Sequence, residues 1–231
     1  GVFIMKKSTQ NVTENIYEQP LPAKKKKFQM LRASILCLLI FTFLCGIVYP
    51  LSFTLVAQTA YPYEANGSQI VVTLPNGEER IFGSELIGQS YESAEYMFGR
   101  VNSGAPTNLS PESDEYQELV KERIAERKEK LAAIGYTETE AIPSDLVTSG
   151  GSGVDPHISP EAAYFQVPVI VAARNKIAQE EAEKNGTEPV LITEDDVNSI
   201  IKKYTEGRFL GIFGQKRVNV LLVNLSLDGL L

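Results

Sequence analysis

The longest hydrophobic run in the chain covers residues 33–63, which include no charged side chain. Its core, Ile35–Ala57, is long enough for a helix across a ~30 Å hydrocarbon layer, which takes about 20 apolar residues. In lipid every backbone N–H and C=O group must be paired within the segment, which favours a helix. The run is longer than the apolar region of a cleaved signal peptide, usually about 7–15 residues. We therefore expect a retained transmembrane helix over residues 31–61, kinked at Pro50.

Two later segments have the character of β-strands. Ile70–Leu74 and Arg80–Phe82 flank the turn signal Asn76-Gly77, and this order predicts a β-hairpin. Near the C-terminus, Arg217–Leu227 is an apolar run with many β-branched residues. That run predicts a buried strand.

A long helix is predicted between these segments. Ser110 is expected to cap it, with Pro111 at its first position and Gly135 at its end. Its apolar positions fall on one face at helical spacing: Tyr116, Leu119, Val120, Ile124, Leu131 and Ile134. The charged positions predict a solvated outer face, on which the pair Glu126 and Lys130 adds only a few tenths of a kcal/mol.

Another helix is expected to begin at Ser159-Pro160, because serine is a good cap and proline suits the first helical position. Pro168 should end or kink this helix near Val167. The polar stretch 178–189 then indicates a helix tail and a loop.

A last helix is expected to open with a capping box formed by Thr193 and Asp196, and to end at Gly207. One face of it carries Val197, Ile200, Ile201 and Tyr204. Helices and strands are mixed without regular βαβ alternation. We therefore expect an α+β fold, in which one N-terminal transmembrane helix precedes a small mixed α/β domain with a sheet backed by helices.

Charge is distributed unevenly along the chain. Residues 1–32 carry seven Lys or Arg and two Glu, for a net charge of +5, and residues 62–231 carry 15 basic and 27 acidic residues, for a net charge of −12. Lys24–Lys27 and Arg32 precede the hydrophobic run, so the positive-inside rule places the N-terminus in the cytoplasm. We expect a basic cytoplasmic arm over residues 1–30 and an extracytoplasmic domain over residues 62–231. Acidic domains repel phosphate backbones, so nucleic acid is not an expected partner.

The stretch VTSGGSGVDPHISP, Val147–Pro160, raises the main question of chemistry. It holds the only histidine of the chain, His157, together with Ser152 and Asp155. These residue types form hydrolytic triads, but triads converge from separate elements, and the chain has no G-x-S-x-G elbow. A hydrolase site is therefore the least favoured interpretation of this stretch.

Two other interpretations of the same stretch remain open. Its free backbone N–H groups suit an anion, although the spacing of a phosphate-binding P-loop is absent. Alternatively, Gly150, Gly151 and Gly153 allow positive φ, and Asp155 before Pro156 favours a turn, so the stretch is a shaped loop that starts a helix. The candidate functional loop comprises Gly151, Ser152, Gly153, Asp155 and His157.

The two cysteines, Cys37 and Cys45, both lie inside the hydrophobic run. Two small apolar side chains in such a helix are expected to serve packing. A lone histidine without cysteine partners is weak evidence for zinc, which takes three or four protein ligands. We therefore expect no metal site.

Two long strings carry a family resemblance. IPSDLVTSGGSGVDPHISPEAAYFQVP, Ile142–Pro168, and YTEGRFLGIFGQKRVNVLLVNLSLD, Tyr204–Asp228, resemble the most characteristic stretches of the C subunit of Kdp-type potassium-transporting ATPases. YPYEANGSQI and GSELIGQSYESAEYMFGR also fit, and the resemblance covers about residues 31–231 in matching order. The chain departs from the family in a shorter segment after Gly99-Arg100, in Val169 where arginine is usual, and in the stretch 178–189, which resembles an insertion.

The resemblance implies a non-catalytic accessory subunit of an ATP-driven potassium importer in the cell membrane. Its implied partners are a channel-like potassium-binding subunit, a P-type ATPase subunit and a small membrane peptide, besides membrane lipid. We expect it to stabilise their assembly. The family has also been described as a catalytic chaperone that raises the ATP affinity of the pump, a role attached to a glutamine that matches Gln166. The predicted topology opposes that alternative, because it places Gln166 outside, away from ATP. No firmly bound cofactor is expected, and ATP enters only through the resemblance.

Overall fold

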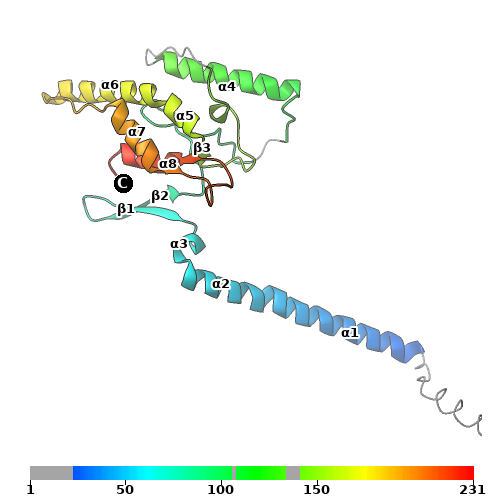
Figure 1. Ribbon diagram of the computed structural model, residues 1–231. Coiled ribbons are helices and arrows are strands. Elements are labelled where there is room, and N and C mark those ends of the chain that lie inside the picture. Colours follow the sequence, from blue (N-terminus) through cyan, green and yellow to red (C-terminus); the bar gives the residue numbers. More distant parts are fainter. Residues whose placement is uncertain (1–22, 106–107, 134–140) are drawn as a thin grey trace, which may run out of the picture. The chain divides into compact units, whose positions relative to one another are not determined.

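The computed structural model describes residues 23–105, 108–133 and 141–231 (Figure 1). The chain divides into two compact units, Gly1–Ala65 and Asn66–Leu231. The described part of the first unit is helical, and the second unit contains helices and two small sheets. The expected α+β class with one long N-terminal apolar helix is confirmed.

The first unit is built around a helical rod. It consists of α1 (Ala23–Phe43), the π-helical turn η2 (Leu44–Val48), α2 (Tyr49–Ala60) and the short α3 (Pro62–Ala65). Within the described part of the chain, one helix is long and apolar enough to cross a membrane, namely the 33 residues Phe28–Ala60. Its large apolar side chains are exposed, as a lipid-facing helix requires.

The distortion expected at Pro50 takes the form of the π turn directly before it. The N–H of Tyr49 bonds to the carbonyl of Leu44, five residues earlier. Proline has no N–H to donate to residue 46, and its ring clashes with that carbonyl in a regular α-helix. The wider turn accommodates the proline, and the helix then continues to Ala60.

The second unit begins with the predicted hairpin, which is confirmed. Strands β1 (Gln69–Thr73) and β2 (Glu79–Ser84) pair antiparallel. Asn76 closes the turn, because its side-chain oxygen accepts the N–H of Glu78 at 3.0 Å, and Gly77 adopts a φ of 82°. Ile70 and Val72 point to one buried face, as the period of a strand requires.

The predicted strand Arg217–Leu227 is wrong beyond its first three residues. Strand β5 covers Arg217–Asn219, and α8 follows directly as Val220–Leu227. The side chain of Asn219 accepts the N–H of Leu222 and thereby caps the helix. The helix is apolar on most sides because it is buried on most sides, and a short apolar run of that kind cannot be distinguished from a strand by its period.

The second sheet is small and has the order β3-β5-β4, with both pairs antiparallel. Strand β3 is His157–Ile158 and β4 is Thr205–Glu206. Because β4 begins at Thr205, the preceding helix α7 (Glu194–Lys203) ends at Lys203 rather than at the predicted Gly207. The capping box of α7, between Thr193 and Asp196, is confirmed.

Helix α4 covers Asp114–Ala133 and starts later than predicted. The hydroxyl of Ser113, not that of Ser110, accepts the N–H of Tyr116 in the first turn, while the carbonyl of Ser110 accepts the N–H of Ser113. Residues 110–113 therefore form a turn before the helix. The predicted end at Gly135 and the face residue Ile134 lie outside the described residues.

The helix predicted at Ser159 is confirmed, as is the break at Pro168. Helix α5 (Pro160–Phe165) is capped by the Ser159 hydroxyl, which accepts the N–H of Ala162, and α6 (Val167–Asn185) starts anew with Pro168 in its first turn. Upstream, Ser144–Leu146 forms the 3-10 turn η3.

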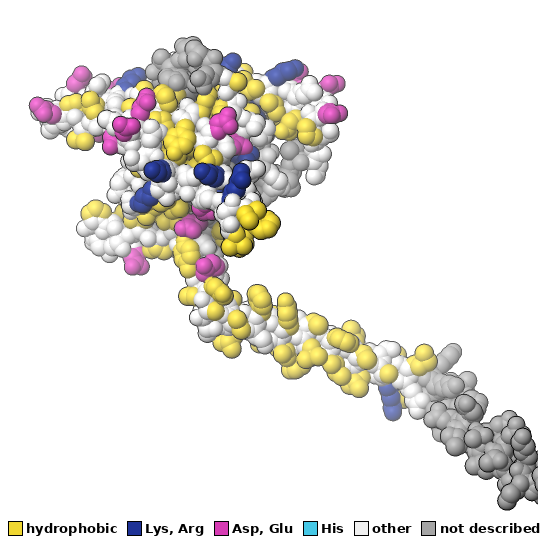
Figure 2. Space-filling view, viewed as in Figure 1, with side chains coloured by type: hydrophobic (Ala, Val, Ile, Leu, Met, Phe, Trp, Pro, Cys, Tyr) yellow, Lys and Arg dark blue, Asp and Glu magenta, His cyan; other side chains and the backbone are white. Residues whose placement is uncertain are grey.

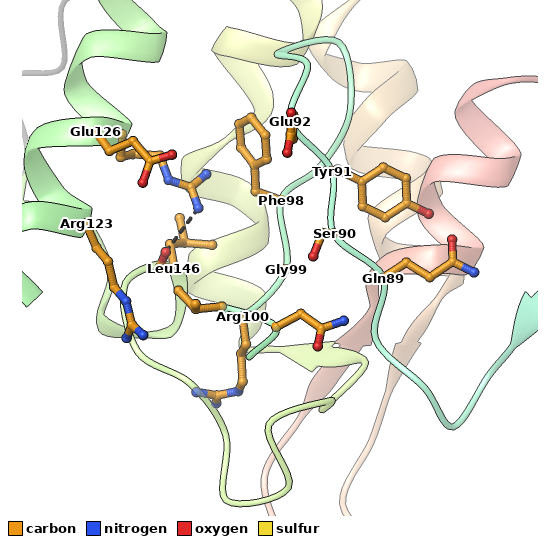
Figure 3. A pocket seen from close by; sticks show the side chains of 13 residues that line it. Gln89, Ser90, Tyr91, Glu92, Phe98, Gly99, Arg100, Arg123, Glu126 and Leu146 are labelled. Carbon is orange, nitrogen blue, oxygen red and sulfur yellow. Dashed lines mark hydrogen bonds between the residues drawn. The ribbon is translucent and has the colours of Figure 1, made fainter. Parts of the chain in front are cut away.

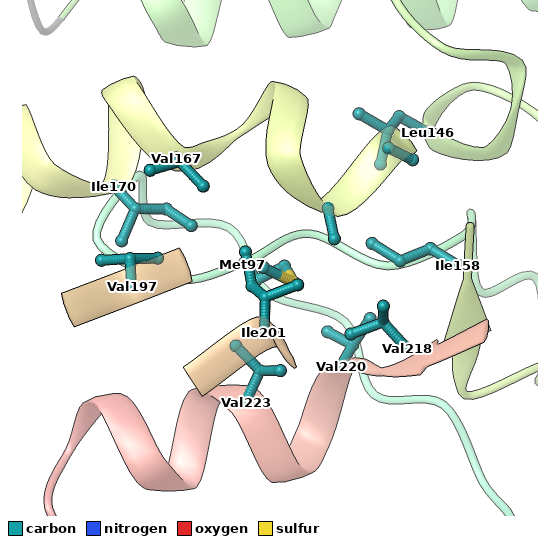
Figure 4. Close-up of a cluster of buried hydrophobic side chains, with 12 residues drawn as sticks. Met97, Leu146, Ile158, Val167, Ile170, Val197, Ile201, Val218, Val220 and Val223 are labelled. Atoms are coloured by element: carbon teal, nitrogen blue, oxygen red, sulfur yellow. The ribbon is translucent and has the colours of Figure 1, made fainter. Parts of the chain in front are cut away.

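Met97 lies at the centre of the main core and is 0% exposed (Figure 4). Side chains from α5, α6, α7, β5 and α8 surround it, among them Val167, Ile170, Val197, Ile201, Val218, Val220 and Val223. A second cluster joins the β1–β2 hairpin to α8 through Ile70, Val72, Leu221 and Leu225. The segment that carries Met97 thus runs without regular secondary structure through the middle of the unit.

Candidate functional site

The loop Val147–Pro160 is a junction between distant segments. Its carbonyl oxygens accept backbone N–H groups from outside the loop: Gly88 donates to Val154, Val101 to Thr148, Ser103 to Gly153 and Val220 to Pro156. The loop therefore completes backbone hydrogen bonds for the segment 85–105 and for the start of α8. Buried backbone groups need such partners, so the loop stabilises the fold around it.

Two glycines of this loop, Gly150 and Gly153, allow neighbouring atoms to approach closely. Gly153 has a φ of 72°, and a Cβ on it would lie 2.5 Å from the carbonyl carbon and oxygen of Ala105. A Cβ on Gly150 would lie 2.9 Å from the Cβ of Asp155. Gly151 is exposed, and among the described residues nothing lies within 4 Å of the point that a Cβ on it would occupy. Gly153 is therefore required by both its conformation and its contacts.

Arg100 binds the two ends of the loop together. Its Nη2 lies 2.6 Å from Oδ1 of Asp145, and its Nε lies 3.3 Å from Oδ2 of Asp155. The same Nε donates to the carbonyl oxygen of His157 at 3.2 Å. Asp145 in turn accepts the N–H of Ser159 at 2.9 Å. One guanidinium thus connects η3, the loop and β3.

The bonds to Ser159 and Arg100 also affect the pKa of Asp145. Burial raises the pKa of its carboxyl group, but hydrogen bonds from Ser159 and the nearby charge of Arg100 outweigh burial. The pKa therefore lies below its ordinary value, and the ionised form of Asp145 is favoured in the folded protein.

The candidate triad residues do not form a nucleophile–base pair. The hydroxyl of Ser152 accepts the N–H of Val154 at 3.2 Å, and Oδ1 of Asp155 accepts the N–H of His157 at 3.0 Å. In the described part of the chain, no hydrogen bond joins Ser152 to His157. A hydrolase requires that bond or a geometry close to it, so the arrangement gives the hydrolase interpretation no support.

His157 is half-buried between acidic neighbours. Its Nδ1 lies 3.6 Å from Oδ1 of Asp155, and its Nε2 lies 3.9 Å from Oε1 of Glu206. Burial lowers the pKa of the imidazole, and the charge of Arg217 lowers it further, while Glu206 and Asp155 oppose the shift. The net result is a pKa below the ordinary value, so the neutral ring is favoured.

Gln166 lies at the junction of α5 and α6, buried and fully hydrogen-bonded. Its Oε1 accepts the N–H of Phe98 at 2.9 Å, and its Nε2 donates to the carbonyls of Phe98 at 3.1 Å and of Ala162 at 3.0 Å. The primary amide thus pairs with the backbone of Phe98 as a neighbouring strand would. Contact between Gln166 and a nucleotide stays a prediction, and it would require these bonds to break.

Asn224 of α8 pairs in the same way with the backbone of Met97, the residue before Phe98. Its Oδ1 accepts the N–H of Met97 at 2.7 Å, and its Nδ2 donates to the carbonyl of Met97 at 2.9 Å. Gln166 and Asn224 therefore hold two successive residues of the irregular central segment from opposite elements. We call this pair the amide clamp.

A cavity of about 240 Å³ opens between α4 and the segment 89–102 (Figure 3). Its lining includes Tyr91, Phe98, Arg100, Arg123, Glu126 and Arg127. Arg123 donates to the carbonyl of Val147 at 3.2 Å, and Arg127 donates to that of Leu146 at 3.0 Å. These two bonds fasten α4 to the loop region.

Arg127 is a buried cation of this cavity. Its guanidinium carbon lies 4.2 Å from the centre of the Phe98 ring, in cation–π geometry. Burial lowers the pKa of Arg127 to about 10, and the charge of Glu126 opposes the shift. The group stays protonated at neutral pH, so the cavity presents positive charge inside an acidic domain.

Known proteins are similar in sequence to this chain over most of its length. The family model "K+-transporting ATPase, c chain" matches residues 31–185 and 187–229. The chain belongs to this family. The potassium-transporting ATPase KdpC subunit of Clostridium perfringens is 45% identical over 220 residues, which cover 88% of this chain and 98% of the relative. The KdpC subunits of Listeria welshimeri and Sorangium cellulosum are 40% and 36% identical, with 89% and 86% of this chain covered and 98% and 97% of the relatives.

The resemblance inferred from the two long strings is therefore confirmed. Those strings correspond to the loop with α5 and to the β4–β5 hairpin with α8. Sequence reasoning located the loop but missed its partner Arg100, the clamp residue Asn224 and the cavity. The one available signal was on α4, where Arg123 and Arg127 recur at a spacing of four residues beside the predicted apolar face.

In the part of the chain that the structure describes, no group of three or more His, Cys, Asp or Glu side chains is arranged to hold a metal ion. Cys37 and Cys45 are exposed on the helical rod.

Proposed function

We propose that this chain is a non-catalytic accessory subunit of an ATP-driven potassium importer, and that it stabilises the assembly of the potassium-binding and ATP-hydrolysing subunits. Family membership supports a place in such a transporter. The observation that carries the accessory role is the use made of the loop's polar groups. Arg100 forms ion pairs with Asp145 and Asp155, and Asp145 accepts a backbone N–H. These groups therefore hold the loop in a fixed conformation, which suits a binding surface better than a catalytic site.

The same proposal places the N-terminus in the cytoplasm and residues 62–231 outside a cell membrane crossed once. The supporting observation is the asymmetry of charge, with six Lys before the span Phe28–Ala60 and Arg32 close to its start. Positive charge next to a span is retained in the cytoplasm. The exposed apolar rod then meets lipid and the membrane helices of its partners. By the resemblance, those partners are a channel-like subunit, a P-type ATPase subunit and a small membrane peptide.

One observation favours a second candidate, the binding of ATP as a chaperone of the pump. Arg100, Arg123 and Arg127 line one cavity, and guanidinium groups recognise phosphates. The cavity volume of about 240 Å³ is nevertheless smaller than that of typical small-molecule sites, about 300–1,000 Å³. All three arginines already donate to backbone carbonyls. We therefore rank ATP binding below the assembly role.

Co-purification tests the proposal. An affinity tag on the ATPase subunit of the same complex is used to capture the potassium-binding subunit from cells with and without this chain. We expect capture and potassium-stimulated ATPase activity to fall together when the chain is absent or carries Arg100→Ala. Lys176→Ala, at an exposed position on α6, is the matched control. Undiminished capture without the chain would refute the assembly role.

The chaperone alternative is tested on the same complex. Arg127→Gln removes the buried cation of the cavity, and the apparent ATP affinity of the purified complex is then measured. The assembly role predicts an unchanged affinity. A weakened ATP affinity in an intact complex would favour the chaperone role instead.

A further inference from the structure

The hairpin between β4 and β5 carries a strongly exposed apolar tip. Phe209, Leu210, Ile212 and Phe213 are 72%, 75%, 73% and 61% exposed. A soluble surface rarely gathers so many large apolar side chains, and such patches mark contacts with proteins or membranes. We call these four residues the hairpin tip.

The hairpin tip is held in an ordered conformation. Phe209 and Phe213 exchange two backbone hydrogen bonds, of 2.8 and 2.9 Å. Leu210 and Gly211 both have positive φ, of 52° and 75°, as the central residues of a tight β-hairpin turn require. The backbone therefore displays the apolar side chains in a fixed geometry, and the exposure is built into the turn.

Cations flank the tip in a domain that is otherwise acidic. Arg208 directly precedes it in sequence, Lys216 follows Phe213 by three positions, and both cations are exposed. Lys202 and Lys203 are the last two residues of α7, and only Tyr204 separates them from β4. Arg217 is paired with Glu206 at 2.6 Å and so contributes less free charge. Figure 2 shows hydrophobic side chains beside Lys and Arg side chains on one face of the domain.

We propose that the hairpin tip inserts into the interfacial region of a lipid bilayer, with Arg208 and Lys216 against anionic headgroups. An apolar tip with a basic rim has the chemistry of such a boundary, where apolar groups enter the acyl region and cations meet the headgroups. The proposal goes beyond the assembly role and does not depend on it.

Tethering makes this contact favourable. The candidate span ends at Ala60, and the domain begins at Asn66, so a bilayer is never far from the domain. A second membrane contact in the same chain is intramolecular and forms at high effective concentration. A tip of four side chains is sufficient under that condition.

The same small size argues against a protein partner as the primary occupant. A stable protein interface takes about 20–30 residues from each side. The connection between β4 and β5 covers only residues 207–216, and its apolar part is the hairpin tip. Lipid needs no complementary pocket, and it matches both the apolar tip and the basic rim.

Tryptophan fluorescence tests the proposal, because the chain contains no tryptophan. Leu210→Trp and, as a second probe with ordinary backbone geometry, Phe213→Trp are introduced into the full chain. Each variant is reconstituted into vesicles of phosphatidylcholine and phosphatidylglycerol, with or without brominated acyl chains. Val190→Trp is the matched control, since Val190 is 85% exposed and lies two positions after an acidic residue, Glu188.

We expect both tip probes to emit at shorter wavelength than the Val190→Trp control and to lose emission in brominated lipid. Replacing Arg208 and Lys216 by Gln should shift the tip toward the free state in anionic vesicles, by about fivefold for each cation. Tip probes that emit like the control, are quenched by aqueous iodide and ignore brominated lipid would overturn the proposal. That result would leave the hairpin tip for a protein partner. Equal insertion into purely zwitterionic vesicles would overturn the role assigned to the cations.

Discussion

Two loops of this domain each contain three glycines and have opposite roles. The loop Val147–Pro160 folds inward: its carbonyls accept backbone N–H groups from the segment 85–105 and from the start of α8, and Gly153 lies so close to Ala105 that a Cβ has no room. The connection 207–216 turns outward, and among the described residues nothing lies within 4 Å of a Cβ placed on Gly211 or Gly214. Glycine allows close approach in the first loop and positive φ in the second.

The difference shows that a glycine-rich stretch has no single meaning. The first loop is joined to the rest of the domain by Arg100 and by backbone bonds, so changes there should destabilise the fold. The second presents apolar side chains that make few contacts within the chain, so changes there should affect binding and leave stability nearly unchanged. Substitutions in matched pairs can separate these effects.

The largest contrast is expected between two glycine substitutions. Gly153→Ala combines positive φ with a clash against backbone and should lower the free energy of unfolding by about 2–5 kcal/mol. Gly211→Ala has the positive φ alone and should cost about 1 kcal/mol. Thermal unfolding of the full chain in detergent measures both. Equal costs would show that the close contact at Gly153 contributes nothing.

The amide clamp gives the next effect. Gln166→Ala leaves the N–H and C=O of Phe98 unpaired in the core and should cost about 2–4 kcal/mol. Asn224→Ala should cost a similar amount through Met97. Gln215→Ala, on the exposed hairpin, serves as the control and should stay within about 0.5 kcal/mol. A stable Gln166→Ala protein with weakened ATP binding would instead support the nucleotide role.

Arg100 should show a somewhat smaller effect. Arg100→Ala removes two partly buried ion pairs and should cost about 1–3 kcal/mol, whereas Arg208→Ala should change stability by less than about 0.5 kcal/mol. Because the pKa of Asp145 is lowered in the folded state, its contribution is present above its unfolded pKa of about 4 and declines as the pH falls through that region. Denaturant titrations at pH 7 and pH 3 check both statements. A contribution of Asp145 as large at pH 3 as at pH 7 would contradict the account.

His157 should add a shallow pH dependence at milder pH. Its folded pKa is lowered, so the unfolded state takes up the proton first. Stability should therefore fall as the pH drops from the unfolded pKa of about 6.5 toward the lower folded pKa. His157→Gln should flatten the curve of stability against pH over this range, as measured by denaturant titration. An unchanged slope would place the titrating group elsewhere.

The smallest effect is expected at the turn of the hairpin. Leu210→Asn introduces a residue that tolerates positive φ and removes an exposed apolar side chain. The free energy of unfolding should therefore change by less than about 0.5 kcal/mol. The same change should weaken binding of the domain to anionic vesicles. A large loss of stability would mean that Leu210 packs within the domain.

Local signals are readable from the sequence, and non-local ones are not. The capping box at Thr193, the cap at Ser159 and the turn at Asn76 each depend on residues a few positions apart, and the structure contains all three. Helix α8 resembles a strand in the sequence because burial on most sides erases its period. The start of α4 is ambiguous in the sequence because Ser110 and Ser113 are both suitable caps.

The site itself depends on contacts between residues far apart along the chain. Gln166 meets Phe98 across 68 positions, and Asn224 meets Met97 across 127. No spacing rule connects residues so far apart, and both amides look like ordinary polar residues in the sequence. The loop can be recognised by its glycines and by the family resemblance. The need for glycine at position 153 becomes clear only from the contact with Ala105, which the sequence does not show.

The most direct measurement is the side of the membrane on which the folded domain lies. Val190→Cys is placed in a chain whose Cys37 and Cys45 are replaced, and intact cells are treated with a membrane-impermeant thiol reagent; Val190 is 85% exposed. The account predicts labelling of intact cells, as an outer accessory domain requires. Labelling only after lysis would place the domain in the cytoplasm, contradict the proposed topology and restore direct ATP binding as the leading function.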